Sequence, residues 1–137
     1  MDNAWMSNED MESKEEERRK EHQAKLRKIK TELARLRKQF KEIDPNKKEL
    51  VQTTISDVAY MTVEMEYLRE AVMRDGTQMP YKNGENQYGT KQNPDAQLYL
   101  QMSQKQTAAI KILIDCLPKE KAVEKDDGFY DFIRQPD

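Results

Sequence analysis

The stretch LRKIKTELARLRKQFKEI, residues 26–43, decides the fold that the sequence predicts. It contains neither glycine nor proline, and most of its residues favour helix. Its apolar residues are separated alternately by three and four positions, the heptad spacing of a helix that packs along a narrow seam. The seam residues are Leu26, Ile29, Leu33, Leu36, Phe40 and Ile43. The pattern predicts a helix over residues 15–43 that packs on another helix of the same chain or of a neighbouring copy.

The same predicted helix carries a large excess of positive charge. Residues 18–41 hold eleven basic and two acidic side chains, whereas residues 1–17 hold seven acidic side chains and one lysine. A basic element among acidic surroundings is the first candidate for contact with a polyanion. Aromatic residues that could stack on single-stranded bases are not interleaved with the basic ones, so a duplex backbone is the more natural target. The candidate DNA-binding residues are Arg18, Arg19, Lys20, Lys25, Arg27, Lys28, Lys30, Arg35, Arg37, Lys38 and Lys41. The alternative is a solvated face that keeps a coiled coil soluble.

Two Asx-Pro steps predict the starts of two further helices. Asp44-Pro45 and Asn93-Pro94 each place a good N-cap residue before a proline, which loses no hydrogen bond at the first helical position. Gly76 is a suitable residue to end the second helix, and Pro118 stops the third. Residues 44–118 are therefore predicted to form an antiparallel helical hairpin. Residues 76–93 form the long break between its helices.

Composition limits the size of the core. Leucine, isoleucine, valine and phenylalanine make up 24 of the 137 residues, too few to fill a single large globular core. We therefore expect an all-α, elongated protein with a long N-terminal basic, coiled-coil-like helix, a helical hairpin and assembly into an oligomer. The residues predicted to join the copies are Leu26, Ile29, Leu33, Leu36, Phe40, Ile55, Val58, Met65, Met102, Ile110 and Leu113.

The two ends of the chain differ from its centre. Residues 1–14 are acidic and lack periodicity, so we expect a disordered tail. Residues 119–137 are charged and then acidic-aromatic. They contain a candidate partner-docking motif, with folding of this segment back over the hairpin as the alternative. The motif consists of Phe129, Tyr130, Phe132 and Ile133.

Several function classes are excluded by residue types that are scarce. The single Cys116 permits neither an internal disulfide nor a cysteine-cluster zinc site, and it suggests a reducing cytoplasm. The single His22 leaves no second imidazole for a metal pair and lies in a charged helix. No apolar run is long enough for a membrane span, and the N-terminus does not read as a signal peptide. We expect no catalytic site, no metal and no cofactor.

Residues 55–120 resemble the small subunit of tailed-bacteriophage terminases. The resemblance is carried by a long hairpin helix, by the loop that ends in Tyr88-Gly89-Thr90-Lys91-Gln92-Asn93-Pro94, and by the amphipathic helix from Asp95 to Leu117-Pro118. It implies a non-catalytic DNA-packaging protein of the host cytoplasm that forms ring oligomers, recognises double-stranded viral DNA and regulates the large terminase subunit. Many such subunits begin with a compact helix-turn-helix domain, which residues 1–43 do not match. DNA contacts therefore do not carry over residue by residue.

A second function of a different class fits the same seam. A structural coiled-coil adaptor or scaffold without nucleic-acid binding would also need a long heptad helix, and the net charge of −2 suits it.

Overall fold

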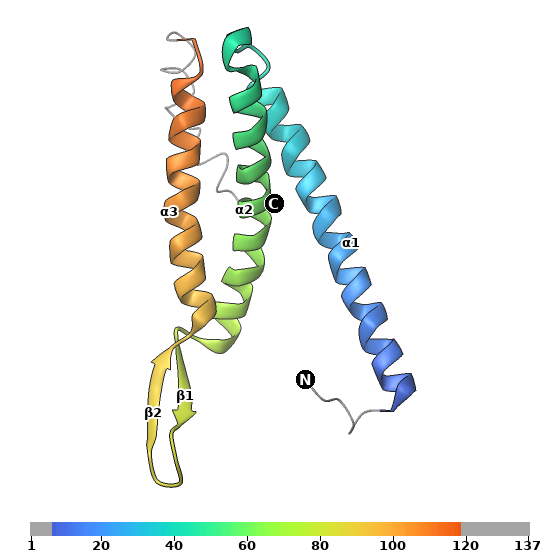
Figure 1. Cartoon of the computed structure of the whole chain (residues 1–137), viewed down its shortest axis with the longest axis vertical. Helices are drawn as coiled ribbons and strands as arrows, with labels where there is room; N and C mark the ends of the chain where they lie inside the picture. Colours follow the sequence, from blue (N-terminus) through green and yellow to red (C-terminus); the bar gives the residue numbers. More distant parts are fainter. Residues whose placement is uncertain (1–6, 119–137) are drawn as a thin grey trace.

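The computed structural model describes residues 7–118. Its elements follow in the order α1 (Asn8–Gln39), a 3-10 turn η1 (Pro45–Lys47), α2 (Lys48–Asp75), β1 (Gln78–Lys82), β2 (Tyr88–Gln92) and α3 (Pro94–Asp115). Helices α2 and α3 run antiparallel side by side, and α1 packs on α2 near its own C-terminal end and diverges from it toward the N-terminus (Figure 1). The expected mostly helical class is confirmed, with a small two-stranded sheet added to it.

Helix α1 begins at Asn8, well before the expected start at residue 15. The Ser7 side chain caps it by accepting a 3.1 Å hydrogen bond from the Asp10 N–H, and its hydroxyl donates to the Asp10 carboxylate. Glu9 and Asp10 also place negative charge in the first turn, where the helix dipole favours it. The prediction of disorder to residue 14 is therefore wrong from Asn8 onward, because acidic residues stabilise a helix at its N-terminus. Residues 1–6 lie outside the described part.

The break between α1 and α2 lies at the predicted Asp44-Pro45 step. The Asp44 side chain accepts a hydrogen bond from the Asn46 N–H at 3.0 Å, and Pro45 occupies the first position of η1. Helix α2 ends at Asp75, and Gly76 follows with φ +83° while its N–H donates to the Val72 carbonyl at 2.7 Å. The predicted end of this helix at Gly76 is thus confirmed by its cap, whereas Asp44 and Pro45 begin the 3-10 turn and α2 itself starts three residues later, at Lys48, without a side-chain cap.

The segment between α2 and α3 forms an antiparallel β-hairpin, where the sequence predicted only turns. Its register places Tyr81 opposite Gly89, and a Cβ atom at Gly89 would lie 2.9 Å from the Tyr81 ring. The absence of a side chain at Gly89 therefore lets the tyrosine ring cover the partner strand. The Lys82 ammonium group lies 5.3 Å from the centre of the Tyr88 ring. The hairpin projects beyond the ends of both helices (Figure 1).

Asn93 fixes the base of this hairpin to both helices. Its side-chain oxygen accepts a hydrogen bond from the Asp95 N–H at 3.0 Å and thereby caps α3. Its side-chain amide donates to the Gly76 carbonyl at 2.8 Å, and its backbone N–H donates to the Thr77 carbonyl at 2.9 Å. Only 2% of the residue is exposed. One buried side chain thus joins the end of α2 to the start of α3.

We expect Asn93→Ala to lower the free energy of unfolding by about 1–3 kcal/mol, because it removes an N-cap and leaves the Gly76 carbonyl without its donor. Urea unfolding followed by circular dichroism measures the change. Asn86→Ala is the matched control, since Asn86 is exposed in the turn of the hairpin. Equal effects of the two substitutions would contradict the role given to Asn93.

The apolar core lies at the end of the molecule where all three helices meet. Helix α1 contributes its last two turns, α2 its first half and α3 its C-terminal half. The core residues are Leu36, Phe40, Val51, Ile55, Val58, Ala59, Ile110, Leu113, Cys116 and Leu117. Ile29, Leu33 and Ile43 pack against this cluster and are partly buried. The heptad seam therefore finds its partner within the same chain, which is one of the two alternatives that the sequence left open.

This arrangement corrects the prediction that the apolar seam residues join copies of the chain. Leu26 remains 43% exposed, and Ile29, Leu33 and Met102 are partly buried. The others are buried within a single chain: Leu36, Phe40, Ile55, Val58, Met65, Ile110 and Leu113. The packing of α2 on α3 and the folding of α1 back onto α2 at the Asp44-Pro45 break bury these residues within one chain.

A buried polar pair interrupts the apolar contact between α2 and α3. The Gln106 side-chain amide donates a 2.8 Å hydrogen bond to the Thr62 hydroxyl, which itself donates to the Val58 carbonyl. Gln106 is 2% exposed. The pair satisfies both buried polar groups and fixes how the two helices are aligned along their length.

We expect Gln106→Ala to destabilise the fold by about 1–3 kcal/mol, because it leaves a cavity and removes the hydrogen bond to Thr62. The double variant Gln106→Leu/Thr62→Val should lose less, since neither polar group is then left without a partner. Thermal unfolding of Gln106→Leu, Thr62→Val and the double variant that combines them gives the coupling energy. Strictly additive losses would show that the two side chains do not act as a pair.

Candidate nucleic-acid interface

Helix α1 is held to α2 by two of its predicted DNA-binding lysines. The Lys25 Nζ atom lies 2.9 Å from a Glu64 carboxylate oxygen, and the Lys28 Nζ atom lies 3.1 Å from a Glu66 carboxylate oxygen. Both ammonium groups also lie over the Tyr67 ring, 4.7 and 5.0 Å from its centre. These contacts neutralise the two lysines and position the basic part of α1 beside α2.

The hydrogen bond that the Lys28 ammonium group donates to the Glu66 carboxylate raises the pKa of Lys28 above its usual value, so the group remains charged at neutral pH. Any stability that this pair adds is fully present below the usual lysine pKa and is lost as the pH rises through the higher pKa of the folded state. Since the Lys28 side chain is 46% exposed, solvent screens the interaction and keeps that contribution small.

Two further basic residues of the predicted set have carboxylate partners within α1. Arg35 pairs with Glu32, which is only 8% exposed, so this arginine lies against the packed side of the helix. Lys20 lies 3.8 Å from Glu16, and both side chains are largely exposed. A pair of this kind is weak and leaves Lys20 accessible.

The other seven basic residues are open to solvent. Every one of them is exposed, and none forms an ion pair with another residue between 7 and 118. They are Arg18, Arg19, Arg27, Lys30, Arg37, Lys38 and Lys41. At about 100° of rotation per residue, Arg27 and Lys38 lie on the side of α1 turned away from its apolar seam, and Lys30 and Arg37 lie beside the seam, each about 40° around the helix from Leu26 or Leu33. We call these four residues the cationic strip.

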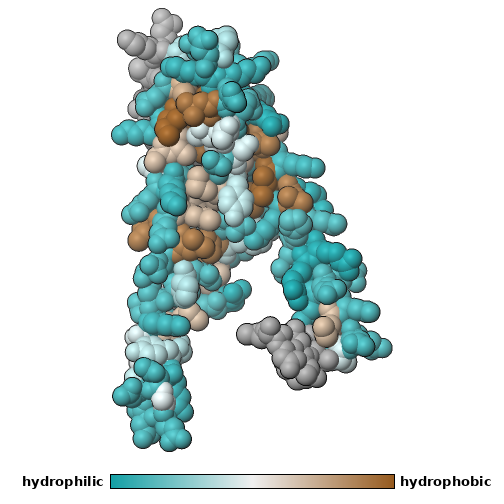
Figure 2. All heavy atoms as spheres, in the orientation of Figure 1, coloured by the Kyte–Doolittle hydropathy of each residue, from teal (hydrophilic) through white to brown (hydrophobic). Residues whose placement is uncertain are grey.

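Hydrophilic and apolar side chains are separated on the surface of the molecule. Hydrophilic side chains cover the diverging part of α1 and the β-hairpin, whereas apolar side chains gather over the part where the helices run together (Figure 2). All residues of α1 from Asn8 to Gln23 are exposed. The exposed surface of the helix is acidic up to Glu17 and mainly basic from Arg18 onward.

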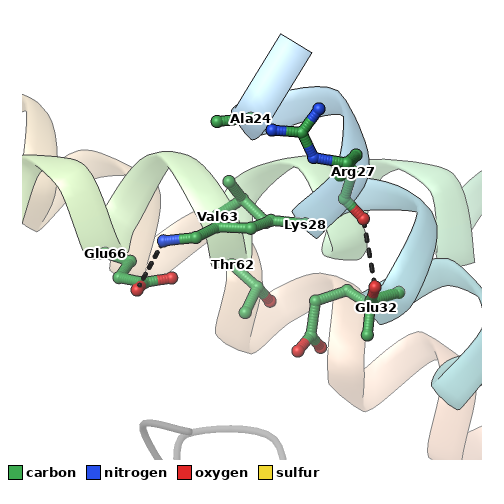
Figure 3. A pocket seen from close by; sticks show the side chains of 8 residues that line it. Ala24, Arg27, Lys28, Glu32, Thr62, Val63 and Glu66 are labelled. Atoms are coloured by element: carbon green, nitrogen blue, oxygen red, sulfur yellow. Dashed lines mark hydrogen bonds and ion pairs between the residues drawn. The ribbon is translucent and has the colours of Figure 1, made fainter. Parts of the chain in front are cut away.

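A cleft of about 410 Å³ lies between α1 and α2, and its Lys28, Glu32 and Glu66 side chains are paired, whereas Arg27 forms no ion pair with another described residue (Figure 3). Lys28 reaches across it to Glu66, while the hydroxyls of Thr31 and Thr62 donate to carbonyl groups of their own helices. The lining residues are Ala24, Arg27, Lys28, Thr31, Glu32, Thr62, Val63 and Glu66. Arg27 lines the cleft and Lys30, Arg37 and Lys38 lie outside it, so the cationic strip offers an anion side chains that have no carboxylate partner among the described residues.

The remaining predicted features are placed as follows. His22 is exposed on α1, and Cys116 is buried in the core. No cluster of three or more histidine, cysteine or acidic side chains suited to a metal occurs among the described residues. None of the helices in residues 7–118 combines the length and apolarity needed to cross a membrane. The candidate docking residues Phe129, Tyr130, Phe132 and Ile133 lie outside the described residues.

Sequence reasoning missed the residues of α2 that neutralise part of the basic helix. Glu64, Glu66 and Tyr67 receive Lys25 and Lys28 because α1 and α2 fold together about the Asp44-Pro45 break. Residues that lie at about equal distances before and after that break face one another in such a pair of helices. This spacing was the signal that could have identified them.

Comparison with known proteins finds no matching family model, no matching curated protein and no matching solved structure.

Proposed function

We propose that this chain is a phage terminase small subunit, a non-catalytic protein of the host cytoplasm. In this role it recognises double-stranded viral DNA and regulates the large terminase subunit during genome packaging. The observation that carries the DNA-binding part is the cationic strip of Arg27, Lys30, Arg37 and Lys38, which is exposed along one side of α1. Cations on a rigid helix can lie along a phosphate backbone and release its counterions.

The ion pairs that fix α1 on α2 support a DNA-binding role for the cationic strip. Lys25, Lys28 and Arg35 form ion pairs with carboxylates of α1 and α2. They therefore hold α1 in place rather than contact phosphates. Because these ion pairs fix the basic part of α1 on α2, the exposed cations are preorganised on a supported helix. Preorganisation lowers the ordering cost of binding.

The packaging role is supported by the residues that resemble terminase small subunits. The segment Tyr88–Pro94 forms β2 and the capped start of α3, so it is the structural junction of the hairpin. Assembly of several copies, in a ring as the resemblance implies, would repeat the cationic strip. Weak phosphate contacts would then add up to firm binding through multivalency.

Two measurements on the full chain test the proposal. Fluorescence anisotropy with a labelled duplex at about 50 mM salt should show binding that is tighter than to a single strand of equal length. A native mass spectrum should show a closed assembly of more than four subunits, which the ring requires. Absence of duplex binding at low salt would overturn the DNA-recognition part, and a monomer would overturn the assembly.

A coiled-coil adaptor or scaffold without nucleic-acid binding is the second candidate. It is favoured by the exposed first half of α1, residues 8–23, which leaves a long helical surface for another protein. A defined dimer or trimer with no affinity for duplex DNA at low salt would support this function over the first.

A further inference from the structure

One line of residues on α1 reverses its charge at the middle of the helix. Glu9, Glu16, Gln23, Lys30 and Arg37 are spaced by seven positions, so they follow one another along the same side of the helix. All five are exposed. Within the line, Glu9 and Glu16 are acidic, whereas Lys30 and Arg37 are basic. Two such lines placed antiparallel therefore bring opposite charges together.

Within residues 7–118 this line lies outside the contact between α1 and α2. Helix α1 packs on α2 through Ile29, Leu33 and Leu36, which lie on another side of the helix. Of the five residues of the line, only Glu16 forms an ion pair with another described residue. Its partner is Lys20, at 3.8 Å, and both side chains are exposed. The complementary charges of the line are therefore free to meet a second helix.

We propose that two copies of the chain pair through this line with their α1 helices antiparallel and a two-fold axis at Gln23. Glu9 then lies opposite Arg37 of the partner subunit, and Glu16 lies opposite Lys30 of the partner subunit. Because the axis relates the two copies, each of these contacts occurs twice. A parallel pairing would instead place like charges opposite each other, which is unfavourable.

An apolar residue beside the line supports the same arrangement. Leu26 is 43% exposed and lies between Gln23 and Lys30 at the three-and-four spacing of a coiled-coil seam. In the antiparallel pair the aliphatic part of the partner's Arg19 covers it, since long basic side chains bury their stems on apolar surface. The dimer thus removes exposed apolar surface that the single chain leaves open.

In the dimer the partner's carboxylates engage Lys30 and Arg37 of the cationic strip, so contact with DNA then falls to Arg27 and Lys38. Arg27 and Lys38 lie roughly a quarter turn around the helix from Lys30 and Arg37, so they stay accessible in the dimer. Loss of DNA binding would leave the dimer intact, and loss of the dimer would leave these two cations able to contact phosphates. The two proposals therefore fail separately.

Charge reversal of one half of the line at a time tests the pairing. In the full chain, Glu9→Lys/Glu16→Lys and Lys30→Glu/Arg37→Glu should each weaken self-association by at least about tenfold, because attraction becomes repulsion at every contact. The variant that carries all four substitutions should recover the wild-type dissociation constant. A mixture of the two half-reversed variants should form a mixed dimer. Sedimentation equilibrium at low salt measures the dissociation constant of self-association for the wild type, the two half-reversed variants and the variant with all four substitutions.

Matched controls change the same net charge elsewhere. Asp57→Lys/Glu70→Lys on α2 and Lys105→Glu/Lys111→Glu on α3 alter exposed residues and should leave the dissociation constant unchanged. Circular dichroism confirms that each variant keeps its helix content. The proposal is overturned if the wild-type chain is monomeric at low salt, or if the half-reversed variants and the controls have the same dissociation constant. It is also overturned if the variant with all four substitutions fails to recover association.

Discussion

Leu36→Ala is expected to destabilise the fold by about 2–5 kcal/mol, a large part of the stability of a domain of this size. Leu36 has no exposed surface and belongs to the cluster that joins α1 to the other helices. Removing its side chain deletes buried apolar area and leaves a cavity between α1 and α2 that rigid helices close only in part. Urea unfolding followed by circular dichroism gives the loss.

Leu50→Ala is the control for this prediction, because Leu50 on α2 is 53% exposed and the change should cost less than about 0.5 kcal/mol. Chemical-shift or hydrogen-exchange data on the Leu36 variant should show the largest changes along α1. Equal losses of stability in Leu36→Ala and Leu50→Ala would contradict the packing of α1 on α2 through its apolar seam.

The second large effect is expected on DNA affinity. Arg27→Glu/Lys38→Glu/Lys41→Glu should weaken binding to duplex DNA by roughly a hundredfold at low salt, because three cations near phosphates become anions. None of the three forms an ion pair with another described residue, and all are exposed, so the fold should be unaffected. Anisotropy titration with a labelled duplex measures the loss.

The matching control is Lys91→Glu/Lys105→Glu/Lys111→Glu, which changes three exposed lysines of β2 and α3 and gives the same net charge. It should weaken binding far less, since only the long-range charge of the protein changes. Equal losses in the two triple variants would mean that DNA responds to net charge and not to α1.

The helix boundaries were predictable because they are encoded locally. Asp44, Gly76 and Asn93 each act on the backbone within a few residues, and the structure shows the cap or turn that each predicted. The start of α1 was missed because a run of acidic residues was judged by its lack of apolar periodicity. The Ser7 cap and the helix dipole stabilise that run as a helix instead.

The features that could not be predicted depend on contacts between distant residues. The seam from Leu26 to Ile43 has the same spacing whether its partner is α2 or a second chain, so only the fold showed where Leu36 packs. The same holds for the basic residues. Their spacing about the Asp44-Pro45 break pairs Lys25 and Lys28 with carboxylates of α2 only if α1 packs on α2, and the sequence left open whether it packs there or on a second chain. The β-hairpin was missed because its strands are polar and contain a proline.

The salt dependence of duplex binding by the wild-type chain and by Arg27→Glu/Lys38→Glu/Lys41→Glu tests the central claim most directly. The slope of log affinity against log salt measures how many phosphates the protein neutralises. If α1 lies along the DNA backbone, the variant should lose about 2.7 units of this slope, close to 0.9 for each cation removed. Equal slopes for the two proteins would contradict the claim that Arg27 and Lys38 of α1, and Lys41 just beyond its end, contact the phosphates.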